Sequence, residues 1–398
     1  MRILRFIITV GFMGACLIVF ANCATIYAYI TKEKAKLTNG VASTTSTVVS
    51  NVTPPIVATT INGNPPATDK DYVLGQGGKS AICLNSKGFP YIAVGDAGNP
   101  NAIIYYWSGS KFVNETISVA PSSQWNNPCI SSDGTLIYAS GIAYGGAMNM
   151  DLLAGTPGSL KFSNQKIAVG QDWDTGRSCY DSVQKVFVVW SSDGLYEEFD
   201  SNFNVLKRDQ MYICCGGEKK AFSIDSDGTW YAAISGFNSN QPGKNSSDSL
   251  FRSSKMGDAV SWASHLCYRS MDSDTTYCEV KGSQNHAIMV AAYNGVCYNV
   301  WDGDKMLFPL DNLPCVGGGD NGGIRFAPQI AALPNGGWWV LWSNAGSVWG
   351  SLVDLKGNPS NPINLGSGSK ISGACDANGV LWYCYNGSAG FTVRGRKP

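Results

Sequence analysis

The hydrophobic and polar positions of the chain follow one repeating pattern from about residue 72 onward. In each copy, a short apolar segment leads into a turn rich in Gly, Asp and Asn. A second segment follows that is almost continuously apolar or aromatic. Such turn residues suit the tight bends of β-hairpins, so each copy predicts a pair of antiparallel strands. The seven copies span residues 81–95, 128–141, 178–194, 222–236, 277–295, 329–346 and 374–387.

The spacing of these copies is nearly regular. Their turns lie near residues 88, 134, 184, 228, 283, 336 and 379, a repeat of about 42 to 55 residues. A four-stranded blade of a β-propeller has a repeat of this length. We therefore expect an all-β fold, a propeller of seven blades, or of six if one copy is a second hairpin of its neighbour. A β-sandwich is the alternative, but it does not require regular spacing over the whole region.

The second segments of the copies contain runs such as FVVW, WYAAI, WWVLW and VLWYCY. Their lack of polar alternation predicts strands that are buried on both faces between neighbouring sheets. The last copy lacks an outer strand because the chain ends soon after residue 393. We expect residues 71–74 to supply that strand, which would leave no unpaired edge there.

One repeat carries a resemblance to a known group of proteins. Residues 327–365, APQIAALPNGGWWVLWSNAGSVWGSLVDLKGNPSNPINL, resemble the repeat of bacterial and viral sialidase-like propellers. In those proteins a dG-fxVxW strand pair precedes a G-x-x-D-x-x-Gnp hairpin. The turn SDGTWYAA at 226–233 loosely resembles an Asp-box, although its Asp-to-Gly spacing departs from that motif. The resemblance implies a propeller fold and says little about activity, since propellers host enzymes, lectins and scaffolds alike.

The N-terminal part of the chain predicts attachment to a membrane. Residues 6–30 are apolar apart from small residues, two Thr and one Asn, and are preceded by Arg2 and Arg5. About 20 such residues cross a bilayer core, and a cleaved signal peptide has a shorter apolar region. Cleavage and lipidation at Cys16 or Cys23 are the alternatives, but the residues before those cysteines match a lipid-attachment site poorly.

These features predict four regions. Residues 1–5 form a cytoplasmic N-terminus, 6–30 a transmembrane signal-anchor, 31–70 a Ser/Thr/Pro-rich stalk and 71–398 the propeller head. The protein would then be a single-pass type II membrane protein, with its head outside the cytoplasm at a cell surface or a viral envelope. Sequons for N-glycosylation begin at Asn51, Asn114, Asn245 and Asn386.

The cysteine content also favours an oxidising compartment. Of 13 cysteines, 11 follow residue 80, whereas the chain has only two histidines and no paired C-x-x-C motif. Disulfides therefore explain the cysteines better than metal sites do. Cys297 with Cys315 and Cys267 with Cys278 are the local pairs that we expect, although sequence alone does not fix the connectivity.

A subset of cysteines precedes the turns by a few residues, on strands that we expect to be innermost. There they would line a central channel, either because a crowded axis favours small residues or because they form disulfides between blades. Ser223 and Ala331 fill the matching place in two other copies. The subset is Cys83, Cys129, Cys179, Cys278 and Cys375.

Charge and motifs exclude several functions. Charged residues make up only 15% of the chain, and its 29 basic and 29 acidic residues cancel, so nucleic acid is not an expected partner. No zinc, calcium or phosphate-loop motif is present, which predicts neither metal nor cofactor. The two histidines, His265 and His286, lie in no serine hydrolase motif, and no catalytic residue is assigned.

The remaining hypotheses are recognition, hydrolysis and a structural role. We expect a surface-displayed propeller that binds a glycan or protein partner, with loop aromatics and arginines as contacts. A sialidase-like glycoside hydrolase is the alternative. It requires clustered arginines and a Tyr–Glu pair, but no arginine precedes residue 177 in the head. A structural envelope or surface protein is the second alternative. The candidate ligand-binding residues are Trp107, Trp125, Trp173, Trp301, Arg177 and Arg325.

Overall fold

The computed structural model describes residues 63–397 with short gaps. The chain divides into a unit of residues 1–55 and a unit of residues 56–398, and all that follows concerns the second unit. The predicted signal-anchor of residues 6–30 and the stalk up to residue 62 lie outside the described residues. Within the described ranges, no helix is long and apolar enough to cross a membrane. The gaps are residues 76, 96–100, 119–124, 136, 144–148, 169–175, 192–194, 211–217, 237–245, 254–260, 270–277, 293–294, 304, 310–311 and 319–327.

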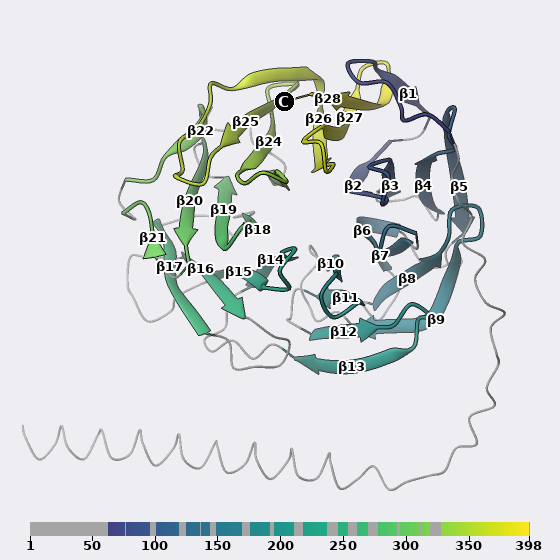
Figure 1. Cartoon of the computed structure of the whole chain (residues 1–398), viewed down its shortest axis with the longest axis horizontal. Helices are drawn as coiled ribbons and strands as arrows, with labels where there is room; N and C mark the ends of the chain where they lie inside the picture. The colour runs from purple at the N-terminus through teal and green to yellow at the C-terminus, as the bar shows by residue number, and fades with distance from the viewer. Residues whose placement is uncertain are drawn as a thin grey trace, which may run out of the picture. The chain divides into compact units, whose positions relative to one another are not determined.

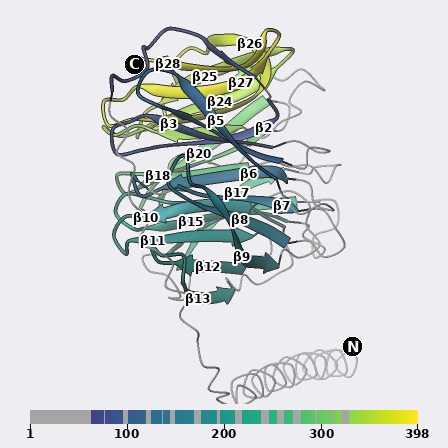
Figure 2. The ribbon, with the colours of Figure 1, turned by 90° about the vertical axis from the view of Figure 1, so that its right-hand side faces the viewer.

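The fold is all-β, as predicted, and its strands form antiparallel sheets around a common central space (Figure 1). Figure 2 shows the same sheets from the side, with most strands running across the short dimension of this unit. The first four sheets each contain four strands in chain order. The first sheet consists of β2 (Lys79–Leu84), β3 (Pro90–Gly95), β4 (Asn101–Trp107) and β5 (Phe112–Ser118). The second consists of β6 (Trp125–Ser132), β7 (Ile137–Ala143), β8 (Asn149–Gly155) and β9 (Lys161–Ala168).

The third and fourth sheets repeat this arrangement, and the fifth has one extra strand, since β22 also pairs with β20. The third sheet consists of β10 (Gly176–Asp181), β11 (Val186–Ser191), β12 (Leu195–Phe199) and β13 (Val205–Gln210). The fourth consists of β14 (Glu218–Ile224), β15 (Trp230–Gly236), β16 (Ser246–Ser253) and β17 (Ser261–Arg269). The fifth consists of β18 (Cys278–Ser283), β19 (His286–Ala292), β20 (Gly295–Asp302), β21 (Lys305–Met306) and β22 (Cys315–Gly318).

The last sheet has seven strands because one long strand, β26, continues from one hairpin set into the next. The first part of β26 pairs with β25 and its last part pairs with β27. The register shifts between Ser369 and Ser372, where Lys370 has a positive φ of 59°. The sheet consists of β23 (Gln329–Ala332), β24 (Trp338–Asn344), β25 (Ser347–Val353), β26 (Ile363–Cys375), β27 (Leu381–Gly387), β28 (Gly390–Arg396) and β1 (Tyr72–Leu74).

The strand at the start of the head pairs with the end of the chain. β1 is antiparallel to β28, with Tyr72 opposite Val393 and Leu74 opposite Phe391. This confirms the predicted pairing of residues 71–74 with the last repeat. The pairing covers the edge of β28, which would otherwise present unpaired backbone groups.

The turns between first and second strands follow the glycine pattern of the sequence. In the β2–β3 turn, the Asn85 backbone N–H donates to Phe89 O at 2.9 Å, and the Gly88 N–H donates to Asn85 O at 2.9 Å. Gly88 has a φ of 77° and Gly228 in the β14–β15 turn a φ of 82°, a conformation that glycine adopts without a Cβ clash. The preceding residue keeps a negative φ, so these are type I turns followed by a glycine bulge.

The second strands form the core, as their apolar runs predict. Side chains of β11, β15, β24 and β27 are buried on both faces along these runs. Among the described residues, six apolar clusters are each shared by two neighbouring sheets, and a seventh lies between the two hairpin sets of the last sheet. For example, Trp190 of β11 packs with Phe222 and Trp230 of the next sheet, with ring centroids 5.5 Å apart for Trp190 and Phe222. Each such side chain contributes roughly 1.5–3 kcal/mol when fully buried.

The first and last sheets are joined in the same way. Ile92 and Ile103 of the first sheet pack against Trp382 and Val393 of the last. The Asn386 side chain adds a two-way link, since its Nδ2 donates to the Gly78 carbonyl and its Oδ1 accepts from the Gly78 N–H, each at 3.1 Å. The two ends of the described chain therefore share one packed interface.

Candidate functional site

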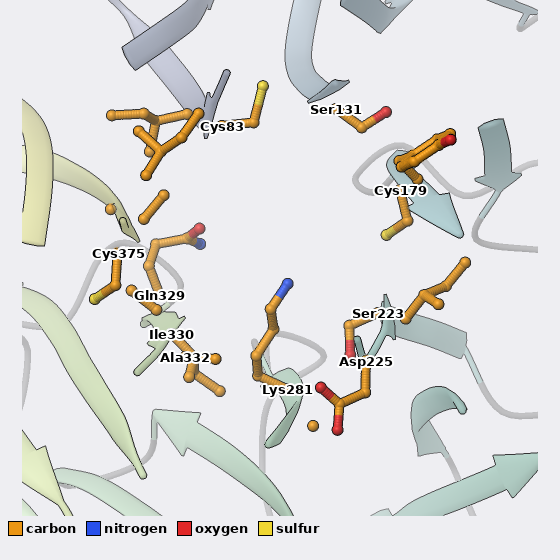
Figure 3. Close-up of a pocket in the computed structure, with 18 of the residues that line it drawn as sticks. Cys83, Ser131, Cys179, Ser223, Asp225, Lys281, Gln329, Ile330, Ala332 and Cys375 are labelled. Carbon is orange, nitrogen blue, oxygen red and sulfur yellow. The ribbon is translucent and has the colours of Figure 1, made fainter. Parts of the chain in front are cut away.

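The first strand of every hairpin set lines one cavity of about 560 Å³ (Figure 3). Its walls come from β2, β6, β10, β14, β18, β23 and the last part of β26. Consecutive members of this group contact one another, and β26 contacts β2. The volume lies within the range of about 300–1,000 Å³ that is typical of small-molecule sites.

Four of the five predicted channel cysteines line this cavity: Cys83, Cys129, Cys179 and Cys375. They come from β2, β6, β10 and β26, which are consecutive around the cavity. We call this side the thiol arc. The fifth, Cys278, has its side chain outside the described residues. The described cysteines of the thiol arc carry no disulfide, so the interpretation based on bonds between blades finds no support in this arc.

Register explains why some of these positions are small. Cys83 lies opposite Tyr91, Ser223 opposite Tyr231, and Ala331 opposite Trp339, whereas Cys129 and Cys179 lie opposite Ser140 and Val188. A small side chain beside a large aromatic one fills the space between paired strands. In the β26–β27 hairpin the matching position, opposite Trp382, is Ala374, and Cys375 comes one residue later. Cys375 therefore does not occupy the position equivalent to Cys83, although it also lines the cavity.

Burial makes three of the cavity thiols poor nucleophiles. Burial raises the pKa of Cys83 and of Cys179, in the second case against the opposing effect of the Lys281 charge. Burial also raises the pKa of Cys375 to about 12. Since the thiolate is the reactive form, these environments disfavour cysteine catalysis.

The side of the cavity formed by β10, β14 and β18 is charged. Arg177 of β10, Asp225 after β14, and Glu279 and Lys281 of β18 all line it. We call these four residues the charged arc. Arg177 Nη2 donates to Glu279 Oε2 at 2.8 Å, and the two side chains are 21% and 11% exposed. A charge-assisted bond between half-buried groups such as these is stronger than a surface ion pair.

Lys281 and Asp225, the other two members of the charged arc, form no such ion pair with any described residue. The Lys281 side chain extends toward the middle of the opening, and the Gln329 amide points toward the same space from β23 (Figure 3). One carboxylate oxygen of Asp225 accepts from the Ser226 backbone N–H at 2.7 Å. The other, Oδ2, is buried without a hydrogen-bond partner, as is the Ser223 hydroxyl. The cavity thus carries a cation and an anion with unused bonding capacity.

Of the predicted ligand-binding residues whose side chains are described, Arg177 lines the cavity and the two tryptophans do not. Trp107 is 5% exposed, packs edge-on against Tyr72 and Phe112, and donates from Nε1 to Asn64 O at 2.8 Å. Trp301 is fully buried in the cluster around β19 and β20. Neither indole ring is exposed for stacking on a ligand in this structure. The side chains of Trp125, Trp173 and Arg325 lie outside the described residues.

The residues that sequence reasoning missed are Asp225, Lys281 and Gln329. Asp225 was interpreted only as part of a hairpin turn, which it also is, since its N–H donates to Thr229 O. Gln329 lies on an otherwise small and apolar inner strand, and Lys281 shares β18 with Glu279. A charged or amide side chain at such a position was the available signal.

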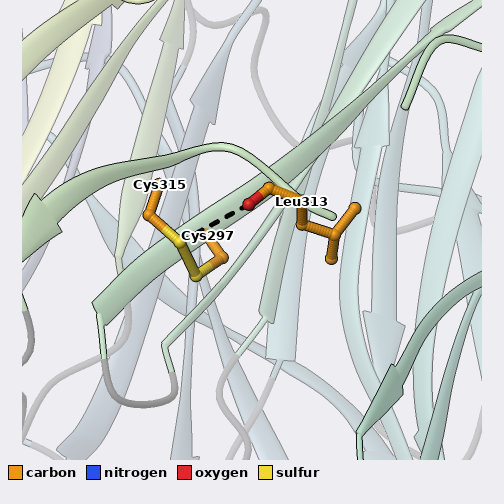
Figure 4. The surroundings of a disulfide bond; sticks show 3 residues. All are labelled: Cys297, Leu313 and Cys315. Carbon is orange, nitrogen blue, oxygen red and sulfur yellow. Dashed lines mark hydrogen bonds between the residues drawn. A yellow bond between two sulfur atoms is a disulfide. The ribbon is translucent and has the colours of Figure 1, made fainter. Parts of the chain in front are cut away.

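One predicted disulfide is confirmed. Cys297 of β20 and Cys315 of β22 are directly opposite in the ladder and are bonded (Figure 4). The bond fastens β22 to the edge of the fifth sheet. The other predicted pair, Cys267 with Cys278, has side chains outside the described residues. In the described part of the chain, no group of three or more His, Cys, Asp or Glu side chains is arranged to hold a metal ion.

The features that a sialidase-like site requires do not converge among the described residues. Arg208 is on the outermost strand β13, where its guanidinium pairs with Glu197 of β12. Arg394 of β28 pairs with Asp71 at 3.3 Å. Tyr196 also lies on β12, the third strand of its sheet. Only Arg177, among the arginine side chains that the structure describes, lines the cavity.

Comparison with known proteins adds no assignment. No model of a known protein family matches this chain, and no match to it was found among curated proteins.

Proposed function

We propose that the chain is a membrane-anchored recognition protein whose central cavity binds a glycan or protein partner outside the cytoplasm. The observation that carries this proposal is that every hairpin set contributes its first strand to one shared cavity. Its lining combines an apolar thiol arc with polar groups that have unused bonding capacity, a composition typical of ligand sites.

A seven-bladed β-propeller is the architecture that we propose for the head. Seven first strands surround the cavity, and each is followed by strands that lie progressively farther from it in the sheet order. The continuous strand β26 divides the last sheet into two such sets. The pairing of β1 with β28 supports closure by the N-terminal strand. Loops and mouths of such rigid scaffolds commonly carry binding.

The proposed location follows from two features. The apolar segment of residues 6–30 has the length of a transmembrane span, and the bond between Cys297 and Cys315 fits an oxidising compartment. We propose a single-pass type II anchor, with the head at a cell surface or viral envelope.

The test is a glycan-array screen with the full-length chain in mild detergent. Ala377 lies at the exposed edge of the cavity lining, so Ala377→Trp would obstruct the cavity without entering the core. The matched control is Ser201→Trp, which places the same side chain in an exposed turn between β12 and β13. We expect one sugar class to be retained by wild type and by the control and to be lost with Ala377→Trp.

Other outcomes discriminate among the alternatives. Retention that Ala377→Trp leaves intact would contradict a ligand in the cavity. Release of a free sugar from the retained glycan would identify a hydrolase. If the folded chain retains no glycan, affinity capture of a protein partner with the same two variants decides between a protein ligand and a structural coat role.

A further inference from the structure

The charged arc contains two unsatisfied groups of opposite sign. Lys281 Nζ forms no hydrogen bond or ion pair with any described residue, and Asp225 Oδ2 is buried without a hydrogen-bond partner. The two residues come from β18 and from the end of β14, which contact each other. In Figure 3 the Lys281 ammonium points into the opening beyond the Asp225 carboxylate.

These two groups do not neutralise each other. They form no ion pair, although Lys281 is near enough to oppose the rise in the pKa of Asp225 that burial causes. The other two members of the arc, Arg177 and Glu279, are paired at 2.8 Å. Within the charged arc, the groups left for a ligand are therefore one cation and one anion; Asp376, just after β26, adds a second carboxylate elsewhere in the lining.

Leaving polar groups buried and unpaired has a cost. An unsatisfied buried polar group costs roughly 1–3 kcal/mol, and more if it is charged. Of the two groups, Asp225 Oδ2 is the buried one without a partner, whereas Lys281 is partly exposed and extends into the opening. A ligand that donates to Asp225 removes the penalty at that carboxylate and can present an anionic group to Lys281.

The pairing of signs selects the class of ligand. A simple anion that pairs with Lys281 is repelled by the Asp225 carboxylate, and a simple cation that pairs with Asp225 is repelled by Lys281. Specificity often depends on such repulsion as much as on attraction. A molecule with both charges a few bonds apart satisfies both residues.

We propose that the charged arc is a subsite for a small zwitterion, with its anionic group on Lys281 and its cationic group on Asp225. This inference rests on the proposed role of the cavity in binding. The zwitterion has two sources with the same chemistry: a free amino acid, or a phosphate–amine group of the kind that lipids and glycans carry.

The test is isothermal titration calorimetry of the full-length chain in mild detergent. The zwitterionic probes are glycine and phosphoethanolamine, which represent the two sources. The monopolar probes are acetate, inorganic phosphate and methylamine. We expect at least one zwitterion to bind tenfold or more tightly than every monopolar probe.

The variants separate the subsite from a general effect of charge. Lys281→Met and Asp225→Asn should each weaken zwitterion binding tenfold or more. Lys281→Arg, which keeps the positive charge, should retain most of the wild-type affinity. Lys305→Met, which removes an exposed lysine from β21, should leave it unchanged. The double variant should bind the zwitterion only slightly less tightly than the single variant with the lower affinity, because the two residues hold one ligand and their effects are not additive. Thermal unfolding of each variant checks that the fold is retained.

Three outcomes would overturn the subsite. Phosphate or acetate binding as tightly as the zwitterions would make Lys281 an anion site. The absence of binding by any zwitterion would remove the subsite altogether. Glycan retention in the array that survives Lys281→Met and Asp225→Asn but not Ala377→Trp would keep the proposed function and reject this inference alone.

Discussion

The Asp181 carboxylate at the end of β10 accepts a hydrogen bond of 3.0 Å from the indole Nε1 of Trp230 in the neighbouring sheet. Asp181 is fully buried. It also accepts from the Val183 and Gln184 backbone N–H groups and from Gln184 Nε2, each at 2.9 Å. One side chain thus fixes its own turn and fastens that turn to the next sheet.

Replacing Asp181 with Asn should lower the free energy of unfolding by about 2–3 kcal/mol. The amide NH₂ would face groups that are themselves donors, and the charge-assisted character of the bonds would be lost. The control is Asp200→Asn in the exposed β12–β13 turn, where Asp200 likewise accepts from the Asn202 and Asn204 N–H groups. Urea denaturation of both variants is the measurement. Equal losses would show that the bond to Trp230 contributes little.

Tyr72 links the first and last sheets. Its backbone pairs with Val393, while its ring packs edge-on against Trp107 and Phe112 at 5.6 and 5.2 Å. We expect Tyr72→Ala to cost about 2 kcal/mol and to speed hydrogen exchange in β1 and β28 before other strands. Val73→Ala is the control, because that side chain is 53% exposed on the same strand. Unchanged exchange in Tyr72→Ala would contradict a fastening role for β1.

The bond between Cys297 and Cys315 closes a loop with a sequence separation of 18 residues. A loop of that length corresponds to about 3 kcal/mol of stabilisation through the unfolded chain. The double variant Cys297→Ser/Cys315→Ser should lose about that much in chemical denaturation. Cys375→Ser, which removes a cysteine without a disulfide, should lose clearly less. A double variant as stable as wild type would mean that β22 is held by its backbone pairing alone.

The buried thiols predict a dependence on pH. Burial raises the pKa of Cys375 and of Cys384 to about 12, above the ordinary value of 9.0. At pH 8 roughly one such thiol in ten thousand is a thiolate, so iodoacetamide should label neither in the folded protein and both after unfolding. Because the folded pKa is the higher one, their contribution to stability is present below pH 9 and lost as pH rises toward 12. Rapid native labelling of Cys375, detected by mass spectrometry, would contradict this environment.

Glycine in the hairpin turns is the reason that most of these turns are predictable from sequence. Gly88, Gly228, Gly336 and Gly379 mark turns because each adopts a positive φ that other residues disfavour. The β10–β11 and β18–β19 turns lack this signal. There Lys185, Gln284 and Asn285 take the positive φ, and only the flanking apolar runs indicated a hairpin.

The site was less predictable because it depends on register. Lys281 lies opposite Ile288 and Val280 opposite Met289, and a shift by one residue would exchange the side chain that reaches the cavity. Trp107 and Trp301 adjoin polar residues and so suggested loop contacts, yet they lie within β4 and β20. Packing between sheets, which decides their burial, is not encoded in the local pattern.

The continuity of β26 has a mechanical consequence. The first part of β26 pairs with β25 and its last part with β27, so continuous strand backbone joins the two hairpin sets of the last sheet. The other described sheets meet each other through side chains and connecting segments. A continuous strand resists relative movement of its two parts more than a loop does. We therefore expect any widening of the cavity around an incoming ligand at the other seams, which β2, β6, β10, β14 and β18 form with one another, β18 with β23, and β26 with β2.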